Sequence, residues 1–228
     1  MPLDKKNLQQ RLISTSVIVP LVLAGVYCGG WVYALMVMIV AALGLREWLC
    51  LAVSKARRRA GSHAVWIALG ILYMAGFGLA MIFLRETPGI GTGMVCYLFA
   101  TVWGTDVGAY AAGRLIGGPK LAPGISPNKT WAGLIGGMAL GPAFGYGVAV
   151  LFGARQALAG IVLAVLLAFV AQLGDLFESW VKRRAGVKES GHLIPGHGGI
   201  LDRIDGLIFA AIFFVLFQLM VGQQMNWW

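Results

Sequence analysis

The residues best suited to chemistry lie in one stretch between Lys188 and Asp205. Its glycines and a proline predict a loop whose backbone can approach a ligand closely. Asp202 and Asp205 stand three residues apart at the start of the apolar run that follows. Carboxylates beside lysine and arginine suit Mg²⁺ that is held jointly with the phosphates of a substrate. We therefore expect both aspartates to face one cation.

Two histidines in this stretch, His192 and His197, raise the question of zinc. A zinc site normally needs three or four close nitrogen or sulfur ligands. The three cysteines, Cys28, Cys50 and Cys96, are scattered through apolar surroundings with no ligand spacing. Zinc is therefore disfavoured, and the cysteines are interpreted as small core residues. The histidines are left to bond phosphate, cap the loop or order the turn.

A polar stripe ends the long apolar run before this loop. Four residues follow i, i+3, i+4, i+7 spacing and so share one helix face: Asp175, Glu178, Ser179 and Lys182. Such a stripe at the end of an apolar helix is expected to line a wet cavity. The alternative is an amphipathic helix end with internal ion pairs.

Asp106 lies in or at the end of another apolar run. A carboxylate at membrane depth costs several kcal/mol unless it is paired or hydrated, so such residues are usually functional. The alternative is a structural partner for a basic residue on a neighbouring helix.

A shorter polar segment, Ser126-Pro127-Asn128-Lys129-Thr130, leads into the next apolar run. Hydroxyls, a lysine and backbone amides beside a helix start suit an anionic phosphate. The glycine spacing of a P-loop is absent. The alternative is simple helix capping by Ser126 or Thr130.

Membrane-spanning helices must position these residues. The chain is 59% hydrophobic and 12% charged, against roughly 25% charged residues in soluble domains. Its apolar runs predict about seven spans, within a range of about six to nine. The fold class is therefore all-α, a polytopic transmembrane helical bundle. The expected spans are 12–29, 31–53, 64–84, 90–112, 133–153, 156–178 and 204–222.

The basic residues predict an orientation for these spans. With a cytoplasmic N-terminus, 15 of the 18 lysines and arginines fall in cytoplasmic segments, as the positive-inside rule requires. The net charge of +9 is explained in the same way, by anionic headgroups, and a nucleic-acid partner is disfavoured.

The chemistry is concentrated in the second part of the chain. Six of the nine acidic residues lie between residues 106 and 205. We expect one integral membrane domain over residues 1–228, with scaffold spans in 1–89 and catalytic spans and cytoplasmic loops in 90–228. Gly133, Gly137 and Gly141, four residues apart, predict a tight helix–helix seam.

A family resemblance joins these motifs. The run Ser179-x-x-Lys182-Arg183-x₄-Lys188-x₆-Pro195-x-His197-Gly198-Gly199-x-x-Asp202-Arg203-x-Asp205 resembles the signature of phosphatidate cytidylyltransferases, or CDP-diacylglycerol synthases. The Asp106–Tyr110 segment, the Ser126–Trp131 loop and Gly174-Asp175 resemble that family in the same order, and Arg46-Glu47-Trp48 does so weakly. The chain departs from the family pattern in having Glu189 in place of Asp and Ala132 in place of Glu or Gln, and it is short for the family.

The resemblance implies transfer of a cytidylyl group from CTP to phosphatidic acid, giving CDP-diacylglycerol and pyrophosphate. As a hypothesis, Asp175 and Asp202 hold Mg²⁺ and Asp205 assists a second cation. Four basic residues would neutralise phosphates, namely Lys182, Arg183, Lys188 and Arg203. Together with Asp175 and Asp202 they form the predicted catalytic group. The predicted substrate-binding residues are Asp106, Ser126, Lys129, Thr130, Ser179, His197, Gly198 and Gly199.

The expected setting is a bacterial inner membrane, with the active site facing the cytoplasm and a homodimer suggested by the glycine seam and the resemblance. Three other classes compete with this interpretation. A non-catalytic scaffold is disfavoured, because it has no use for six acidic and several basic residues around one loop. A secondary transporter would carry its charges near the bilayer midplane in repeat-related positions, whereas these lie on one face. A transferase acting on another lipid phosphate has the same physical needs, and nucleotide choice would separate it.

Overall fold

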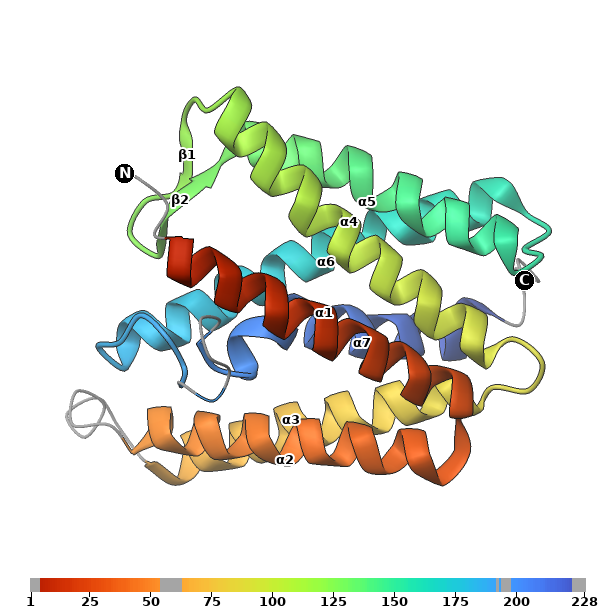
Figure 1. The fold of residues 1–228 in the computed structure, drawn as a ribbon, viewed down its shortest axis with the longest axis horizontal. Helices are drawn as coiled ribbons and strands as arrows, with labels where there is room; N and C mark the ends of the chain where they lie inside the picture. The colour runs from red at the N-terminus through yellow and green to blue at the C-terminus, as the bar shows by residue number, and fades with distance from the viewer. Residues whose placement is uncertain (1–4, 54–62, 192, 194–197, 223–228) are drawn as a thin grey trace. The chain divides into compact units, whose positions relative to one another are not determined.

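The computed structural model describes residues 5–53, 63–191, 193 and 198–222, with side chains described between residues 16 and 221 of those ranges. Over these residues the chain forms seven α-helices, one π-helical turn and one pair of short strands. The all-α fold expected from the sequence is confirmed (Figure 1).

The helices follow the predicted apolar runs. Their bounds are α1 (Lys5–Cys28), α2 (Gly30–Ala52), α3 (His63–Glu86), α4 (Gly91–Leu115), α5 (Trp131–Leu151), α6 (Ala157–Arg184) and α7 (Leu201–Phe217), with the π-helical turn at Gln218–Gly222. Two helices are longer than predicted, because α1 begins at Lys5 and α6 continues to Arg184. The residues added at these ends are mostly lysine, arginine and glutamine, which have good helix propensity, so the helix continues beyond the apolar run.

In the part of the chain that the structure describes, five helical segments are long and apolar enough to cross a membrane, namely α2, α3, α5, α6 and Leu201–Val221. A shorter apolar stretch, Ser16–Cys28, lies in α1. Helix α4, which contains Asp106 and five glycines, is not among the five. The chain is thus an integral membrane protein, and the cytoplasmic N-terminus stays a prediction.

The chain divides into two compact units, and each is described by itself. Unit 1 comprises Met1–Gly78 and Val181–Ile204, and unit 2 comprises Leu79–Trp180 and Asp205–Trp228. Helices α3, α6 and α7 contain residues of both units. The predicted division into scaffold and catalytic regions at residue 89 concerns roles and stays a prediction.

In unit 1, α2 and α3 lie side by side (Figure 1). The Trp48 side chain of α2 is 1% exposed, and its Nε1 donates a hydrogen bond to the carbonyl oxygen of Trp66 at 2.8 Å. A Cβ on Gly70 of α3 would collide with the Trp48 ring, so the glycine allows the indole to seat. This packing fixes the part of α2 that also carries Glu47.

In unit 2, α4 and α5 lie side by side along a glycine seam (Figure 1). A Cβ on Gly137 would lie 2.8 Å from the carbonyl oxygen of Thr105, and one on Gly141 would lie 2.9 Å from that of Thr101. Only glycine permits such close backbone contact. The seam predicted from the four-residue spacing is confirmed.

A short antiparallel hairpin joins α4 to α5. Strand β1 (Lys120–Ala122) pairs with β2 (Ser126–Thr130), with Lys120 opposite Thr130 and Ala122 opposite Ser126. The sequence indicated only a polar loop here. Thr130 is the N-cap of α5, because its Oγ1 accepts a hydrogen bond from the Gly133 amide at 3.0 Å. Thr130 is thus a helix cap, and its predicted substrate contact stays a prediction.

Candidate functional site

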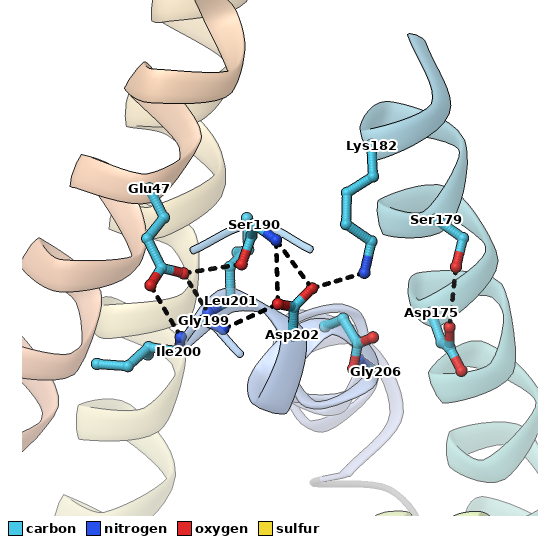
Figure 2. A network of polar contacts seen from close by, with 11 residues as sticks. Glu47, Asp175, Ser179, Lys182, Ser190, Gly199, Ile200, Leu201, Asp202 and Gly206 are labelled. Carbon is cyan, nitrogen blue, oxygen red and sulfur yellow. Dashed lines mark hydrogen bonds and ion pairs between the residues drawn. The ribbon is translucent and has the colours of Figure 1, made fainter. Parts of the chain in front are cut away.

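In unit 1, Asp202 lies in the first turn of α7 with its carboxylate surrounded by donors (Figure 2). Oδ1 accepts from Lys182 Nζ at 2.6 Å. Oδ2 accepts from the amides of Ser190 at 3.0 Å and Gly199 at 2.9 Å. The side chains of Lys182 and Asp202 are 12% and 8% exposed. Because the pair is largely buried, removing one partner would leave an uncompensated charge.

A second carboxylate, Glu47 of α2, meets the same segment from the other direction (Figure 2). Its Oε1 accepts from the Ile200 amide at 3.0 Å, and its Oε2 accepts from the Leu201 amide at 2.9 Å and from Ser190 Oγ at 2.9 Å. Glu47 is 3% exposed. It thus accepts from two amides at the start of α7, which a helix cannot satisfy internally and which favour negative charge.

Glycines make room for these two carboxylates. Gly198 has a φ of 82°, in the left-handed region that glycine adopts without strain. Gly199 is buried, and a Cβ there would collide with Ser190 Oγ and Glu47 Oε2. A Cβ on Gly191 would lie 2.6 Å from Glu47 Oε1. The glycine-rich sequence therefore serves close approach of the loop backbone to Glu47 and Asp202.

We call Glu47, Lys182, Ser190, Gly199 and Asp202 the Glu47–Asp202 cluster.

In unit 2, Lys129 of β2 reaches helix α6. Its Nζ lies 2.7 Å from Asp175 Oδ2 and donates to Gln172 Oε1 at 3.3 Å. Ser179 Oγ, one turn further along α6, lies 3.4 Å from Asp175 Oδ1 (Figure 2). The Lys129 and Asp175 side chains are 19% and 31% exposed. We call Lys129, Gln172, Asp175 and Ser179 the Lys129–Asp175 cluster.

Unit 2 also gathers acidic groups near Asp205 of α7. Helices α6 and α7 touch through glycine, since a Cβ on Gly174 would lie 2.7 Å from the carbonyl oxygen of Asp205. The charges of Asp106, Asp175 and Glu178 act on Asp205. Within the described residues, no three acidic, histidine or cysteine side chains are arranged to hold a metal by themselves.

The residues of the predicted polar stripe on α6 differ in their exposure to solvent. Glu178 is buried, whereas Asp175, Ser179 and Lys182 are partly exposed. Asp175 pairs with Lys129 of β2, and Lys182 pairs with Asp202 of α7. Both charges thus contact segments outside α6.

Other predicted residues are placed less tightly. Asp106 is exposed on α4, and Ser126 is half-buried at the start of β2. The basic side chains of Arg183, Lys188 and Arg203 are exposed. His192 and His197 lie outside the described residues. The substrate and metal roles assigned to all these residues stay predictions.

Comparison with known proteins places the chain. The sequence profile of the cytidylyltransferase family matches residues 9–75 and 53–221. The chain belongs to this family. Among curated relatives, the phosphatidate cytidylyltransferase of Rickettsia bellii is 35% identical over 225 residues, which cover 93% of this chain and 92% of that protein.

Other relatives match over part of their length. The phosphatidate cytidylyltransferase of Brucella suis is 52% identical over 152 residues, 67% of this chain and 56% of that protein. That of Haemophilus influenzae is 47% identical over 139 residues, 59% of this chain and 48% of that protein. The chain thus spans about half the length of these two relatives.

One residue of the candidate site was missed by sequence reasoning. Glu47 received no role beyond a weak family resemblance, although it accepts three hydrogen bonds beside Asp202. A signal was present, because an ionisable residue inside a membrane-length apolar run is a functional candidate by default. The same argument had been applied to Asp106 alone.

Proposed function

We propose that the chain transfers a cytidylyl group from CTP to phosphatidic acid, giving CDP-diacylglycerol and pyrophosphate for phospholipid synthesis. The observation that carries this proposal is the match to the Rickettsia bellii phosphatidate cytidylyltransferase over 93% of this chain and 92% of the relative. The pairing of lysines with carboxylates in both clusters supports a site for phosphates.

The chemistry is an in-line displacement at phosphorus. A phosphate oxygen of phosphatidic acid forms a bond to the α-phosphorus of CTP, while the bond from that phosphorus to the bridging oxygen breaks and pyrophosphate leaves. Phosphatidic acid is already an anion near neutral pH, so the reaction hardly needs a general base. Positioning and charge neutralisation supply most of the catalysis.

The basic residues neutralise the phosphates in this proposal. Lys182 and Lys129, each paired with an aspartate in the ligand-free chain, are placed to exchange part of that pairing for phosphate oxygens. Arg183, Lys188 and Arg203 are exposed, and they are proposed to contact the incoming anion. Ser126, Ser179, Thr130, His197, Gly198 and Gly199 are the remaining proposed phosphate or headgroup contacts, and Asp106 is proposed to orient a basic partner or to act on the metal indirectly.

The donor chemistry fits Mg²⁺, which proteins hold through one or two carboxylates together with substrate phosphates. In unit 2, Asp175 is partly exposed and its charge acts on Asp205, which gives an oxygen-only set to be completed by a triphosphate. In unit 1, Asp202 is the third proposed carboxylate, and a cation there would compete with Lys182. Bound Mg²⁺ would supply neutralisation of charge on the triphosphate.

The setting belongs to the same proposal. The active site faces the cytoplasm of a bacterial inner membrane, as the positive-inside distribution of lysine and arginine favours. The lipid reaches the site from the bilayer, and CTP arrives from the cytoplasm. The homodimer stays an expectation from the family resemblance, because the glycine seam joins α4 and α5 of one chain.

Pyrophosphate release tests the proposal. The purified chain in mixed micelles is given phosphatidic acid, CTP and Mg²⁺, and each component is then omitted or CTP is replaced by ATP, GTP or UTP. We expect release that needs all three components, and a loss of about 100-fold or more in Asp202→Asn. Exposed Glu86 gives the matched control, Glu86→Gln.

Two results would count against the proposal. No release with any nucleotide would overturn the activity. Release by wild type that is matched by Asp202→Asn would leave the reaction standing and remove Asp202 from the site.

A further inference from the structure

The start of α7 is held by a side chain from a distant part of the sequence. Glu47 of α2 accepts from the amides of Ile200 and Leu201, while Asp202, in the first turn of α7, accepts from the amides of Ser190 and Gly199. Ser190 is bound through both of its donors, since its Oγ donates to Glu47. The two carboxylates thus accept hydrogen bonds from the same segment, which comprises Ser190 and the residues at the start of α7.

Through this arrangement, Glu47 also affects the position of Lys182. Glu47 fixes the backbone at Ile200 and Leu201, and with it the orientation of the first turn of α7 that carries Asp202. Asp202 Oδ1 in turn receives Lys182 Nζ at 2.6 Å. Any rotation of this turn would therefore move the lysine partner as well.

Gly199 and Gly191 confine Glu47 further. Atoms of the Glu47 carboxylate occupy the space that a Cβ on either glycine would need. The carboxylate is 3% exposed, so its hydrogen bonds face little competition from water. The loop is built around this group.

We propose that Glu47 is a positioning residue for the cytidylyl-transfer site: through the start of α7 and Ser190 it holds Asp202 and Lys182 in the geometry that receives substrate phosphates. It does not itself touch substrate. This inference rests on the proposed function and adds a residue that lies far from the motif stretch in the sequence.

Glu47→Gln is the sharpest variant because it preserves shape. A carboxylate accepts on both oxygens, whereas an amide accepts on one and donates from the other. Whichever way the amide turns, Ile200 or Leu201 loses its acceptor, because Glu47 Oε1 serves one amide and Oε2 serves the other. Glu47→Asp keeps both acceptors but shortens the side chain by one methylene, and Glu86→Gln is the exposed control.

The first readout is hydrogen–deuterium exchange of the ligand-free protein in detergent, which requires no activity. We expect peptides that cover Ser190 and Gly199–Asp202 to exchange at least about tenfold faster in Glu47→Gln, with peptides of α4 and α5 unchanged. Ser190→Ala, which removes a single donor to Glu47, should give a smaller change in the same peptides.

The second readout is the kinetics of pyrophosphate release. In Glu47→Gln we expect kcat to fall roughly 10- to 100-fold, as for other residues that orient an active-site group. We expect the KM for CTP to change by less than about threefold, and Glu47→Asp to recover part of the lost kcat. If Glu47 contributed only to general stability, Glu47→Gln would lower the amount of folded enzyme. The fall in kcat per folded enzyme, with little change in KM, would then not be seen.

The two readouts separate the possible failures. Exchange at wild-type rates in Glu47→Gln would overturn the inference, and so would faster exchange with an unchanged kcat. Should wild type release no pyrophosphate at all, the proposed function fails and the catalytic half of the inference fails with it. The exchange experiment would still decide whether Glu47 orders the loop.

Discussion

The two clusters of charged residues are built in different ways. In the Glu47–Asp202 cluster of unit 1, both carboxylates accept from backbone amides, and Lys182 and Asp202 are 12% and 8% exposed. In the Lys129–Asp175 cluster of unit 2, Lys129, Gln172, Asp175 and Ser179 contact one another through their side chains, and the Lys129 and Asp175 side chains are 19% and 31% exposed. One helix, α6, contributes to both.

The difference concerns how freely each aspartate can change partner. A carboxylate held by amides is fixed by the course of the chain, so it can be displaced only together with the loop. A carboxylate held by a partly exposed lysine can exchange that lysine for a metal ion or water at little cost, since such pairs contribute about 1 kcal/mol or less. We therefore expect the Glu47–Asp202 cluster to keep its side chains in fixed positions. We expect the Lys129–Asp175 cluster to change its contacts when substrate binds.

Among the variants that test this comparison of the two clusters, the largest effect is expected from Gly199→Ala, which disrupts the Glu47–Asp202 cluster. The added Cβ would collide with Ser190 Oγ and Glu47 Oε2. We expect a loss of about 1–3 kcal/mol in the free energy of unfolding and a fall of more than about tenfold in kcat.

Gly147→Ala in α5 is the matched control, because a Cβ there meets nothing within 4 Å. We expect it to keep wild-type activity. Both variants are measured by thermal unfolding in detergent and by pyrophosphate release. Equal stability and equal activity of the two variants would refute the claim that the Glu47–Asp202 cluster is rigid.

An intermediate effect is expected from Lys129→Met in the side-chain cluster. Losing a partly exposed pair should change the free energy of unfolding by less than about 1 kcal/mol. Because Lys129 is proposed to bind phosphate, the KM for CTP or phosphatidic acid should rise roughly tenfold, the size of one charge-assisted contact. Lys120→Met, at the exposed first residue of β1 in the same hairpin, is the control. A large loss of stability in Lys129→Met would show that this cluster is structural too.

The smallest effect is expected from Ser179→Ala. Its contact to Asp175 is 3.4 Å long and partly exposed, whereas Ser190 donates to Glu47 at 2.9 Å in a buried site. We expect Ser179→Ala to lower kcat/KM by less than about threefold and Ser190→Ala by about fivefold or more, since a buried hydrogen bond contributes about 1 kcal/mol. The measurement is pyrophosphate release. A larger loss of kcat/KM in Ser179→Ala than in Ser190→Ala would contradict the expected difference between the clusters.

The helices could be predicted because their apolar runs are long and their glycine spacing is regular. Periodicity and length determine such elements locally, so α2, α3 and α5 lie close to their expected positions. The hairpin was missed because β1 and β2 are only three and five residues long and contain no alternating apolar pattern.

Partner choice in the site was the part that local patterns could not supply. The motif stretch pointed to Asp202 and Lys182, but not to their contact with each other. Glu47 joins Ser190 and α7 across a long separation in the sequence. Which carboxylate accepts from which amide depends on how α2 packs beside the loop, and no spacing within the motif contains that information.

The glycine seam of α4 and α5 has a consequence for the lipid that the proposed reaction consumes. Carbonyl oxygens of Thr101 and Thr105 face the α-carbons of Gly141 and Gly137 directly, and this contact leaves no width for a hydrocarbon chain. The contact between the two helices is therefore closed to a hydrocarbon chain along these residues. In the proposed reaction, the fatty-acid tails of the lipid would enter by another route, and the product would leave by a route that also avoids this contact.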